Sequence, residues 1–594
     1  MEECKKRGEM NPAYQWDFSD IYESREAWEK AYAEAEEAVK GLATVPGTLG
    51  VSAASLKAGL DKIYAAAEKV ELVYLYASLH KSADNGDADN QTMEGRAIQL
   101  FMALSTAQAF VSPEILSIDR ATLEGYMADD SLKIYRHELE DILRGAAHTL
   151  SADKEEMLAG LGDVSGSPRD AFDMLESVDM TFPNIHNESG KEVPLTHGTY
   201  GVYLHSSDPA VRRECYEKYF SEFNRYIHTF TAMYAGSVKF DTFFAKVRGF
   251  SSACEAALFN SAVPVSVYDS LVEAVHSGLP TMKRYLALRK KVLGLEKLGM
   301  YDLYCPMVAD VDYPQTFESA MELVHKATAP LGERYQELLT MAENNHWMDV
   351  YENKGKTTGA FSCGVHGVHP YVLLNFTDTL EDAYTVAHEL GHAMHSYLSS
   401  EAQPYATHDY KIMVAEVAST VNEVLLTMYL LRTETDKARR AFILNHFLES
   451  FRTTVFRQTL FAEFERKAHD AYMAGQPLTS ELLNKIYHEL NELYYEGAEV
   501  GALHDIEWAR IPHFYNAFYV YQYATGFCSA VAIADHIVKT GDASDYLRFL
   551  TTGGSDYPLE ELKIAGVDLT RPDTVKNALE VFDRTLTELE ELIG

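Results

Sequence analysis

Two histidines and a glutamate near the middle of the chain have the spacing of a zinc-dependent hydrolytic site. The motif is His388-Glu389-Leu390-Gly391-His392. On a helix, residues four apart lie on one face about one turn from each other, so both imidazoles can bind one Zn²⁺. Glu389 is then placed to take a proton from a water on the metal. With 22 histidines in 594 residues, and even with all 89 acidic residues counted as Glu, chance gives roughly 0.12 matches to this pattern. The motif therefore indicates a metallopeptidase site.

A catalytic zinc usually has three protein ligands and one open position, so a third ligand is needed. His395 lies seven residues from His388, about 10.5 Å along a helix axis. This span is too long for one ion, and we interpret His395 as a cleft residue or a neighbour of the ligands. Glu416 lies in a mostly apolar helical stretch, where a carboxylate is costly unless it is paired or binds a metal, and we predict it as the third ligand. Glu423, on the same face, either orients a ligand histidine through its free ring N–H or is an ordinary exposed glutamate.

The residues before the motif predict a strand followed by a helix. Residues 371–376 form a short apolar run of strand type. Thr379, with Asp382 three residues later, has the form of a helix N-cap and capping box. We therefore predict a helix over about 380–399 that carries the metal motif.

Strand character extends over about 346–376, with glycines that let another backbone approach. An extended substrate can add to a sheet edge through main-chain hydrogen bonds that do not depend on its sequence. Residues 359–376 are our hypothesis for that role. The alternative is an ordinary hairpin that supports the helix.

A tyrosine-rich segment, residues 510–526, is a second candidate for chemistry. It contains His513 and, among its tyrosines, Tyr519 and Tyr521. Such groups can donate hydrogen bonds to the oxyanion that forms at a scissile carbonyl. Taken alone, a tyrosine-rich amphipathic segment more often packs in a core, so both interpretations remain open.

These motifs resemble the thimet oligopeptidase superfamily, and most closely its bacterial branch, oligoendopeptidase F. The resemblance extends over essentially the whole chain. It implies a mainly α fold with two helical lobes that enclose a deep substrate channel and a small β region before the zinc-binding helix. It also implies an endopeptidase that cleaves short peptides and not folded proteins. The residues that carry it are 379–395, Glu416, Glu423, 16–22, 245–250 and 294–298.

Members of this family carry a histidine followed by a tyrosine-rich stretch at the position of residues 510–526. The resemblance therefore implies Tyr521 as the first choice of oxyanion donor, with His513 assisting and Tyr519 in reserve. The glycine-rich loop that the thimet branch has between the histidine and the tyrosines is absent here, and the spacing is shorter.

Composition narrows the class of partner. The chain has 89 acidic and 52 basic residues and a formal net charge of −37, which argues against a nucleic-acid backbone or an anionic membrane surface as partner. The charge favours cationic or neutral ligands, or serves solubility alone. No apolar core follows the first charged residues, and the most apolar run, residues 517–534, is interrupted by polar residues, so we expect neither a signal peptide nor a membrane span. Six scattered cysteines are typical of reduced thiols in a cytoplasmic protein.

The length exceeds one ordinary domain. We predict an N-terminal helical lobe over 1–200 and a catalytic zinc metallopeptidase domain over 201–594. Residues 162–168 are expected to form a loop, and residues 180–195 a hairpin. Helical periodicity predicts helices within 24–160 and at 208–248, 265–292, 315–343, 543–551 and 573–592.

The predicted mechanism uses one Zn²⁺ held by His388, His392 and Glu416, with Glu389 as general base and short peptides as substrates. An exopeptidase that trims one or two residues from an end would use the same zinc chemistry. A non-catalytic peptide-binding or metal-storage protein needs no general base, so Glu389 argues against that class.

Overall fold

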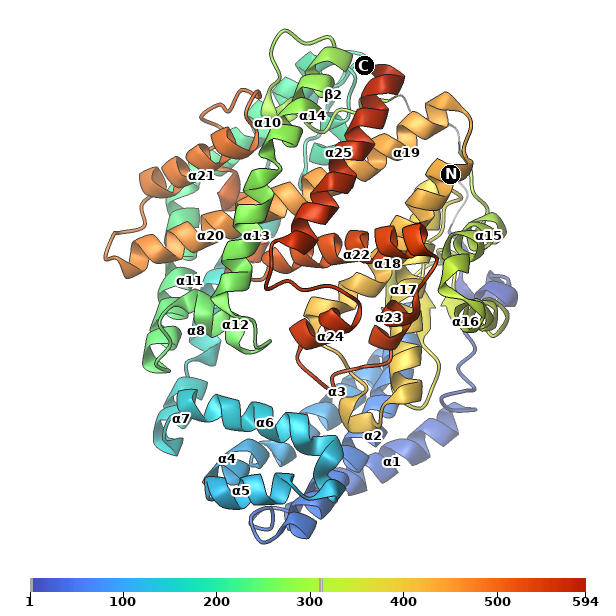
Figure 1. The fold of residues 1–594 in the computed structure, drawn as a ribbon, viewed down its shortest axis with the longest axis vertical. Coiled ribbons are helices and arrows are strands. Elements are labelled where there is room, and N and C mark those ends of the chain that lie inside the picture. The colour runs from blue at the N-terminus through green and yellow to red at the C-terminus, as the bar shows by residue number, and fades with distance from the viewer. Residues whose placement is uncertain (1–3, 309–310, 312) are drawn as a thin grey trace. The chain divides into compact units, whose positions relative to one another are not determined.

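The computed structural model describes residues 4–308, 311 and 313–594. Helices dominate and the strands are short (Figure 1), so the predicted mainly α fold is confirmed. Contacts divide the chain into two compact units, each assembled from three segments. Unit 1 is Met1–Ala147, Tyr313–Tyr429 and Ile533–Gly566, and unit 2 is His148–Asp312, Leu430–Ala532 and Val567–Gly594. The lobe boundary near residue 200 stays a prediction.

Unit 1 holds the predicted metal motif. Its elements are α1 (Arg25–Gly41), α2 (Ala53–Ala83), α3 (Ala88–Gln108), α4 (Val111–Ser117), α5 (Arg120–Met127), α6 (Arg136–Gly145), α15 (Phe317–Thr328), α16 (Glu333–Asn344), β3 (Met348–Asp349), β4 (Phe361–Cys363), β5 (Tyr371–Leu373), α17 (Leu380–Ala402), most of α18 (Ile412–Thr433), α23 (Ser544–Phe549) and α24 (Pro558–Ile564).

Unit 2 holds the tyrosine-rich segment. Its elements are α7 (Ala152–Ala159), α8 (Gly162–Met174), β1 (Ile185–His186), β2 (Glu192–Val193), α9 (His197–Leu204), α10 (Pro209–Arg225), α11 (Ile227–Val247), α12 (Ala253–Phe259), α13 (Val265–Ser277), α14 (Leu279–Val292), α19 (Lys437–Ser450), α20 (Arg457–Met473), α21 (Ser480–Tyr494), most of α22 (Tyr521–Thr540) and α25 (Asp573–Ile593).

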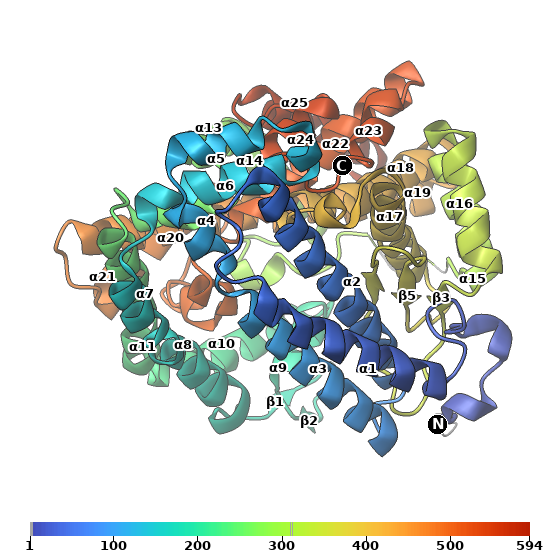
Figure 2. The same ribbon diagram turned by 90° about the horizontal axis from the view of Figure 1, so that it is seen from below.

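Helices α1, α2 and α3 lie side by side in unit 1 (Figure 2) and share one hydrophobic core. Trp28 of α1 is fully buried in it. The indole N–H of Trp28 donates to the Val73 carbonyl of α2 at 2.9 Å, so this large side chain packs without leaving a polar atom unsatisfied.

The predicted β region is confirmed as a three-stranded sheet with the order β3-β5-β4. β3 pairs parallel to β5, and β4 pairs antiparallel to it, with Ser362 opposite Val372. The indole N–H of Trp16 donates to the carbonyls of Trp347 and Val372 at 3.1 and 2.9 Å. These two hydrogen bonds tie the N-terminal segment to the sheet that precedes α17.

Three of the long predicted helices are each two helices in the structure. The break in the first comes at Tyr226, between α10 and α11, and the break in the second at Gly278, between α13 and α14. The third break comes at Gly332, where φ is +88°, a backbone conformation that glycine adopts without strain. Helical periodicity continues through such breaks, so it locates the helical stretch but not the turn within it.

The loop predicted at residues 162–168 is wrong, because these residues begin α8. Pro168 lies inside this helix, against the usual preference. A Cβ built on Gly236 of α11 would lie 3.3 Å from Cγ of Pro168, so α8 and α11 pack closely there. This tertiary contact overrides the local propensity.

The hairpin predicted at residues 180–195 is confirmed, with β1 and β2 antiparallel.

One helix among the described residues, α18, is long and apolar enough to cross a membrane. A second candidate is counted only if residues 88–117 and the sharply bent α5 are taken as one span. In α18, 67% of the most apolar window is buried inside the protein, as in the core helix of a globular fold.

Candidate metal centre

Helix α17 begins at a capping box and carries the motif in its third and fourth turns. The hydroxyl of Thr379 accepts from the Asp382 N–H at 3.1 Å, and the Asp382 carboxylate accepts from the Thr379 N–H at 2.9 Å. A cap of this kind is worth about 1 kcal/mol. The predicted helix is thereby confirmed, and the capping box fixes its start at Leu380.

Gly391, inside the motif, lies where α17 meets α18. A Cβ built on Gly391 would lie 2.5 Å from Cα of Ser419 and 2.7 Å from the Ala418 carbonyl oxygen. Only a residue without a side chain permits this approach. The close crossing brings the helix that carries Glu416 next to the two histidines.

Asn422 and Tyr335 also join these helices, and sequence reasoning missed both. The Asn422 amide of α18 donates to the Ala387 carbonyl of α17 at 3.0 Å, and the Tyr335 hydroxyl of α16 donates to the Asn422 side-chain oxygen at 2.9 Å. Asn422 is fully buried. Asn422 could have been found in the sequence as an amide in a mostly apolar helix, directly before Glu423.

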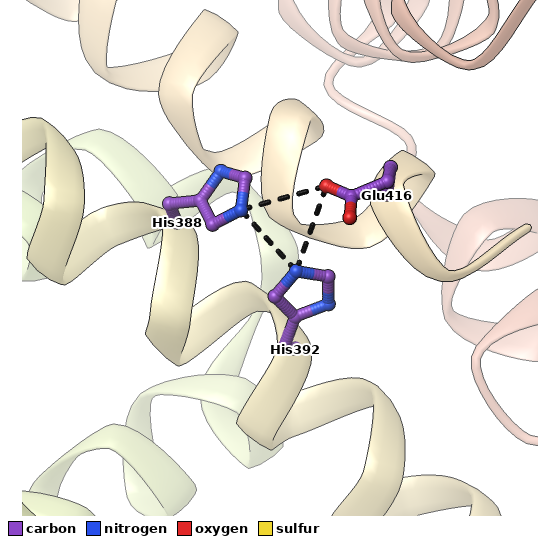
Figure 3. A group of neighbouring side chains, drawn as sticks. All are labelled: His388, His392 and Glu416. Atoms are coloured by element: carbon purple, nitrogen blue, oxygen red, sulfur yellow. Dashed lines mark hydrogen bonds and ion pairs between the residues drawn. The ribbon is translucent and has the colours of Figure 1, made fainter. Parts of the chain in front are cut away.

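His388, His392 and Glu416 point toward one another (Figure 3). The two Nε2 atoms are 3.2 Å apart, and Oε2 of Glu416 lies 3.5 Å from Nε2 of His388 and 3.7 Å from Nε2 of His392. A metal ion can be held by three or more His, Cys, Asp or Glu side chains whose ligand atoms all lie within 4.8 Å of one another. Within the described part of the chain, His388, His392 and Glu416 form the one group of this kind.

The geometry of this triangle fits a single zinc ion. Two ligand atoms about 2.1 Å from a zinc ion at the tetrahedral angle lie about 3.4 Å apart. The three separations bracket that value. Two imidazole nitrogens and one carboxylate oxygen also form a donor set of catalytic zinc sites, which keep a fourth position open.

Glu423 pairs with the other ring nitrogen of His388, Nδ1. Burial opposes the imidazolium, but this hydrogen bond and the nearby carboxylates raise the pKa of His388 to about 9. To bind a metal, the ring must lose one proton. The proton that remains on Nδ1 faces Glu423, and the lone pair of Nε2 then points toward His392 and Glu416. Of the two interpretations of Glu423, the geometry favours the orienting one.

Glu389 is 7% exposed beside the ligands. Burial is the largest influence on its carboxyl and raises the pKa, while the two histidines of the motif lower it. The net result is a pKa above the ordinary glutamate value, which moves the group toward the range of a general base that works near neutral pH.

His395 is fully buried and does not belong to the triangle. Its ring stacks on Tyr410 with centroids 3.7 Å apart. Burial, and then the neighbouring His392, lower the pKa of His395 to about 3, so the ring is neutral. The structure therefore does not place it in a cleft, and the interpretation as a neighbour of the ligands is the one that fits.

The predicted oxyanion donors lie in unit 2. His513 and Tyr519 stack with centroids 6.4 Å apart, and the Tyr523 hydroxyl lies 3.5 Å from Nε2 of His513. Burial, and then the charge of Arg169, lower the pKa of His513, so the ring is neutral at pH 7. Tyr521 lies apart from this group at 2% exposure.

Tyr521 packs on Tyr268, with ring centroids 5.3 Å apart. A phenol enclosed in this way cannot meet a substrate unless its surroundings move. The burial argues against Tyr521 as the first choice of donor and favours Tyr519, whose side chain is partly exposed beside His513.

Comparison with known proteins places the chain in a family. The sequence profile of peptidase family M3 matches residues 202–581, and a profile described as oligopeptidase F matches residues 114–182. The oligopeptidase PepF of Bacillus subtilis is 41% identical over 591 residues, which cover 99% of this chain and 88% of that protein. An oligoendopeptidase F homologue of Lactococcus lactis is 40% identical, with 99% of both chains covered.

Solved structures agree with the sequence comparisons. A putative peptidase from Chlamydophila abortus superposes with a TM-score of 0.92 at 32% identity and covers 99% of this chain and all of its own. Oligoendopeptidase-F from Enterococcus faecium gives a TM-score of 0.73 at 37% identity, covering 95% of this chain and 98% of its own. The chain therefore belongs to peptidase family M3, as a member of its oligoendopeptidase F branch, and is a metallopeptidase.

Proposed function

We propose that this metallopeptidase is a zinc-dependent endopeptidase that hydrolyses internal bonds of short peptides. The observation that carries the proposal is the triangle of His388, His392 and Glu416, which fits one zinc ion and lies beside the buried Glu389. The relatives named oligoendopeptidase F support the choice of short peptides and internal bonds.

His388, His392 and Glu416 would hold the zinc ion, which would lower the pKa of a bound water and polarise the substrate carbonyl. Glu389 accepts a proton from that water on its carboxylate as the carbonyl carbon is attacked. The same carboxyl then donates the proton to the leaving amine. Its burial serves this role, because a raised pKa lets one group accept and release a proton near neutral pH.

The oxyanion role of His513, Tyr519 and Tyr521 remains a proposal that rests on the family pattern. In this proposal Tyr519 is the main oxyanion donor and His513 assists it, because both side chains are more exposed than that of Tyr521. Loss of one such donor typically lowers turnover by about 10²–10³.

Strand β4 is the proposed docking edge for an extended substrate. It is an edge strand in the order β3-β5-β4. Gly364, directly after β4, lies so close to α17 that a Cβ there would be 2.4 Å from Cβ of Ser396. A peptide paired with β4 would therefore run next to the helix that carries the motif, held by main-chain bonds that accept any sequence.

We further propose a cytoplasmic location, as the sequence predicted. The six cysteines are free in the described structure, and Cys215, Cys254, Cys305 and Cys528 are buried. Isolated reduced thiols are typical of proteins in a reducing compartment.

The test uses an internally quenched peptide of about ten residues, blocked at both ends, because only an endopeptidase can cut it. We expect cleavage that stops in chelator and returns with zinc. Glu389→Gln should abolish cleavage while zinc stays bound, whereas Glu416→Gln should weaken zinc binding itself. Glu401→Gln is the matched control, since Glu401 is half exposed near the end of the same helix and pairs with Arg334.

Two results would overturn the proposal. If the blocked peptide survives while an unblocked one loses one or two terminal residues, the enzyme is an exopeptidase. If Glu389→Gln cleaves as well as the wild type, the general base is another group.

A further inference from the structure

Phe518 has a backbone conformation that a bulky residue rarely adopts. Its φ is +58°, in the left-handed region, where the side chain of any residue except glycine meets steric resistance. Phe518 comes directly before Tyr519 and three residues before the first residue of α22. Strain of this kind persists only where the surroundings hold it in place.

A buried carboxyl group holds the backbone of Phe518. The Phe518 N–H donates to Oε1 of Glu465, on α20, at 2.8 Å, and Glu465 is fully buried. The second oxygen of Glu465, Oε2, has no hydrogen-bond partner among the described residues. Burial is the main cause of a raised pKa of Glu465; the hydrogen bond from Phe518 opposes this shift, and nearby Asp241 adds to it.

The ring of Phe518 is held by the same face of α20. It packs on His469, one turn after Glu465, with centroids 4.7 Å apart, and on Tyr268 edge-to-face at 5.9 Å. The Tyr268 hydroxyl in turn donates to the Ala462 carbonyl of α20 at 2.5 Å. Backbone and ring of Phe518 are therefore both fixed to one helix.

We propose that Glu465 is a positioning residue for peptide hydrolysis, which by accepting the Phe518 N–H fixes the backbone from which Tyr519 projects. The inference rests on the proposed function, in which Tyr519 donates to the oxyanion. Glu465 itself touches no reacting atom. It acts by keeping Tyr519 in one place beside His513, because a misplacement of about 1 Å can cost about a hundredfold in rate.

The first test compares Glu465→Leu with Glu465→Gln. Leucine removes the acceptor, and we expect kcat and kcat/KM to fall by the same factor, roughly tenfold to a hundredfold, with KM unchanged. Glutamine keeps an oxygen that can accept the Phe518 N–H and has nearly the size of glutamate. Its activity should stay within about threefold of the wild type.

The matched control is Glu463→Leu. Glu463 lies on the same helix and is mostly buried, but it pairs with His276 and Tyr494 and not with the tyrosine-rich segment. This variant should lose stability and keep kcat. Bound zinc, measured by metal analysis, should equal that of the wild type in every variant, because the proposed ligands are on other helices.

The decisive readout is a double-mutant cycle with Tyr519→Phe. If Glu465 acts through Tyr519, the double variant should have nearly the kcat of Tyr519→Phe alone. Losses that multiply would overturn the inference, as would a Glu465→Leu enzyme with unchanged kcat. If Glu465→Leu does not fold, Glu465→Asp, which shortens the reach by one methylene, should show a smaller loss of the same kind.

Failure of the proposed function gives a different experimental result from failure of the Glu465 inference. In that case the wild-type enzyme leaves the end-blocked peptide intact. Failure of the Glu465 inference alone leaves wild-type cleavage, its zinc dependence and the loss in Glu389→Gln as expected.

Discussion

Glu561, on α24, is a buried carboxyl group whose titration should be visible in the stability of the protein. Burial is the main cause that raises its pKa to about 8, against about 4.3 in an unfolded chain. Because the folded pKa is raised, the stabilisation is fully present below the unfolded value and is lost as the pH rises through 8. Over that window the loss is at most roughly 1.4 kcal/mol per pH unit.

Glu561→Gln removes this titration without changing the size of the side chain. The free energy of unfolding of the wild type, relative to this variant, should fall between pH 5 and pH 8 and level off above it. Denaturant titrations of both proteins across this range measure the difference. Curves that stay parallel would mean that Glu561 is not a buried neutral acid.

Single residues differ in how far sequence reveals their role. His388, Glu389 and His392 could be predicted, because one metal and one base dictate both residue types and their spacing on a helix. Glu416 could be predicted as a carboxylate in an apolar helix, and the structure brings it to the histidines. The choice among the tyrosines stays a prediction. The burial of Tyr521 could not be read from the sequence, because the left-handed backbone at Phe518, three residues before it, has no local signal.

At the scale of elements, the contact between α17 and α18 depends on Gly391. Gly391→Ala places a methyl group 2.5 Å from Cα of Ser419, and this neighbour is backbone, which cannot turn aside. We expect a loss of roughly 1–3 kcal/mol in unfolding free energy. Zinc affinity should also fall, because the helices separate and Glu416 moves away from the histidines.

Gly95→Ala is the control for this prediction. Gly95 lies within α3, and a Cβ there meets nothing within 4 Å. Alanine should stabilise this helix by about 1 kcal/mol and leave zinc affinity unchanged. Thermal unfolding and competition with a chromogenic chelator measure both quantities, and a Gly391→Ala protein as stable as Gly95→Ala would contradict the close-contact argument.

Elements with their own local signals were predictable, and elements fixed by packing were not. Helix α17 could be predicted from its capping box and motif. The breaks at Tyr226 and Gly278 could not be predicted, because helical periodicity continues through them. The helix across Pro168 could not be predicted either, because the close contact with Gly236 of α11 is absent from a local pattern. The small sheet could be predicted because the short apolar run at residues 371–376 has strand character on its own.

At the scale of the whole molecule, the net charge of −37 should affect which peptides reach the enzyme. A negative field attracts cationic peptides, and salt screens it. Raising salt from about 20 to about 500 mM should lower kcat/KM for a lysine-rich peptide by about tenfold and raise it for a matched glutamate-rich one. Equal responses of the two peptides would mean that the charge serves solubility alone.

The discontinuity of the two units has a consequence for how the chain folds. The proposed zinc ligands are all present once residue 416 has been synthesised, but their support is not. Gly553 packs against the Thr407 and His408 carbonyls, and the Tyr546 hydroxyl lies 3.5 Å from the Ala418 carbonyl. Unit 1 therefore cannot close its core around the metal centre until more than a hundred further residues have left the ribosome. Contacts so distant in sequence slow folding and expose intermediates to aggregation, so the nascent enzyme should remain inactive and dependent on protection until nearly its whole length is made.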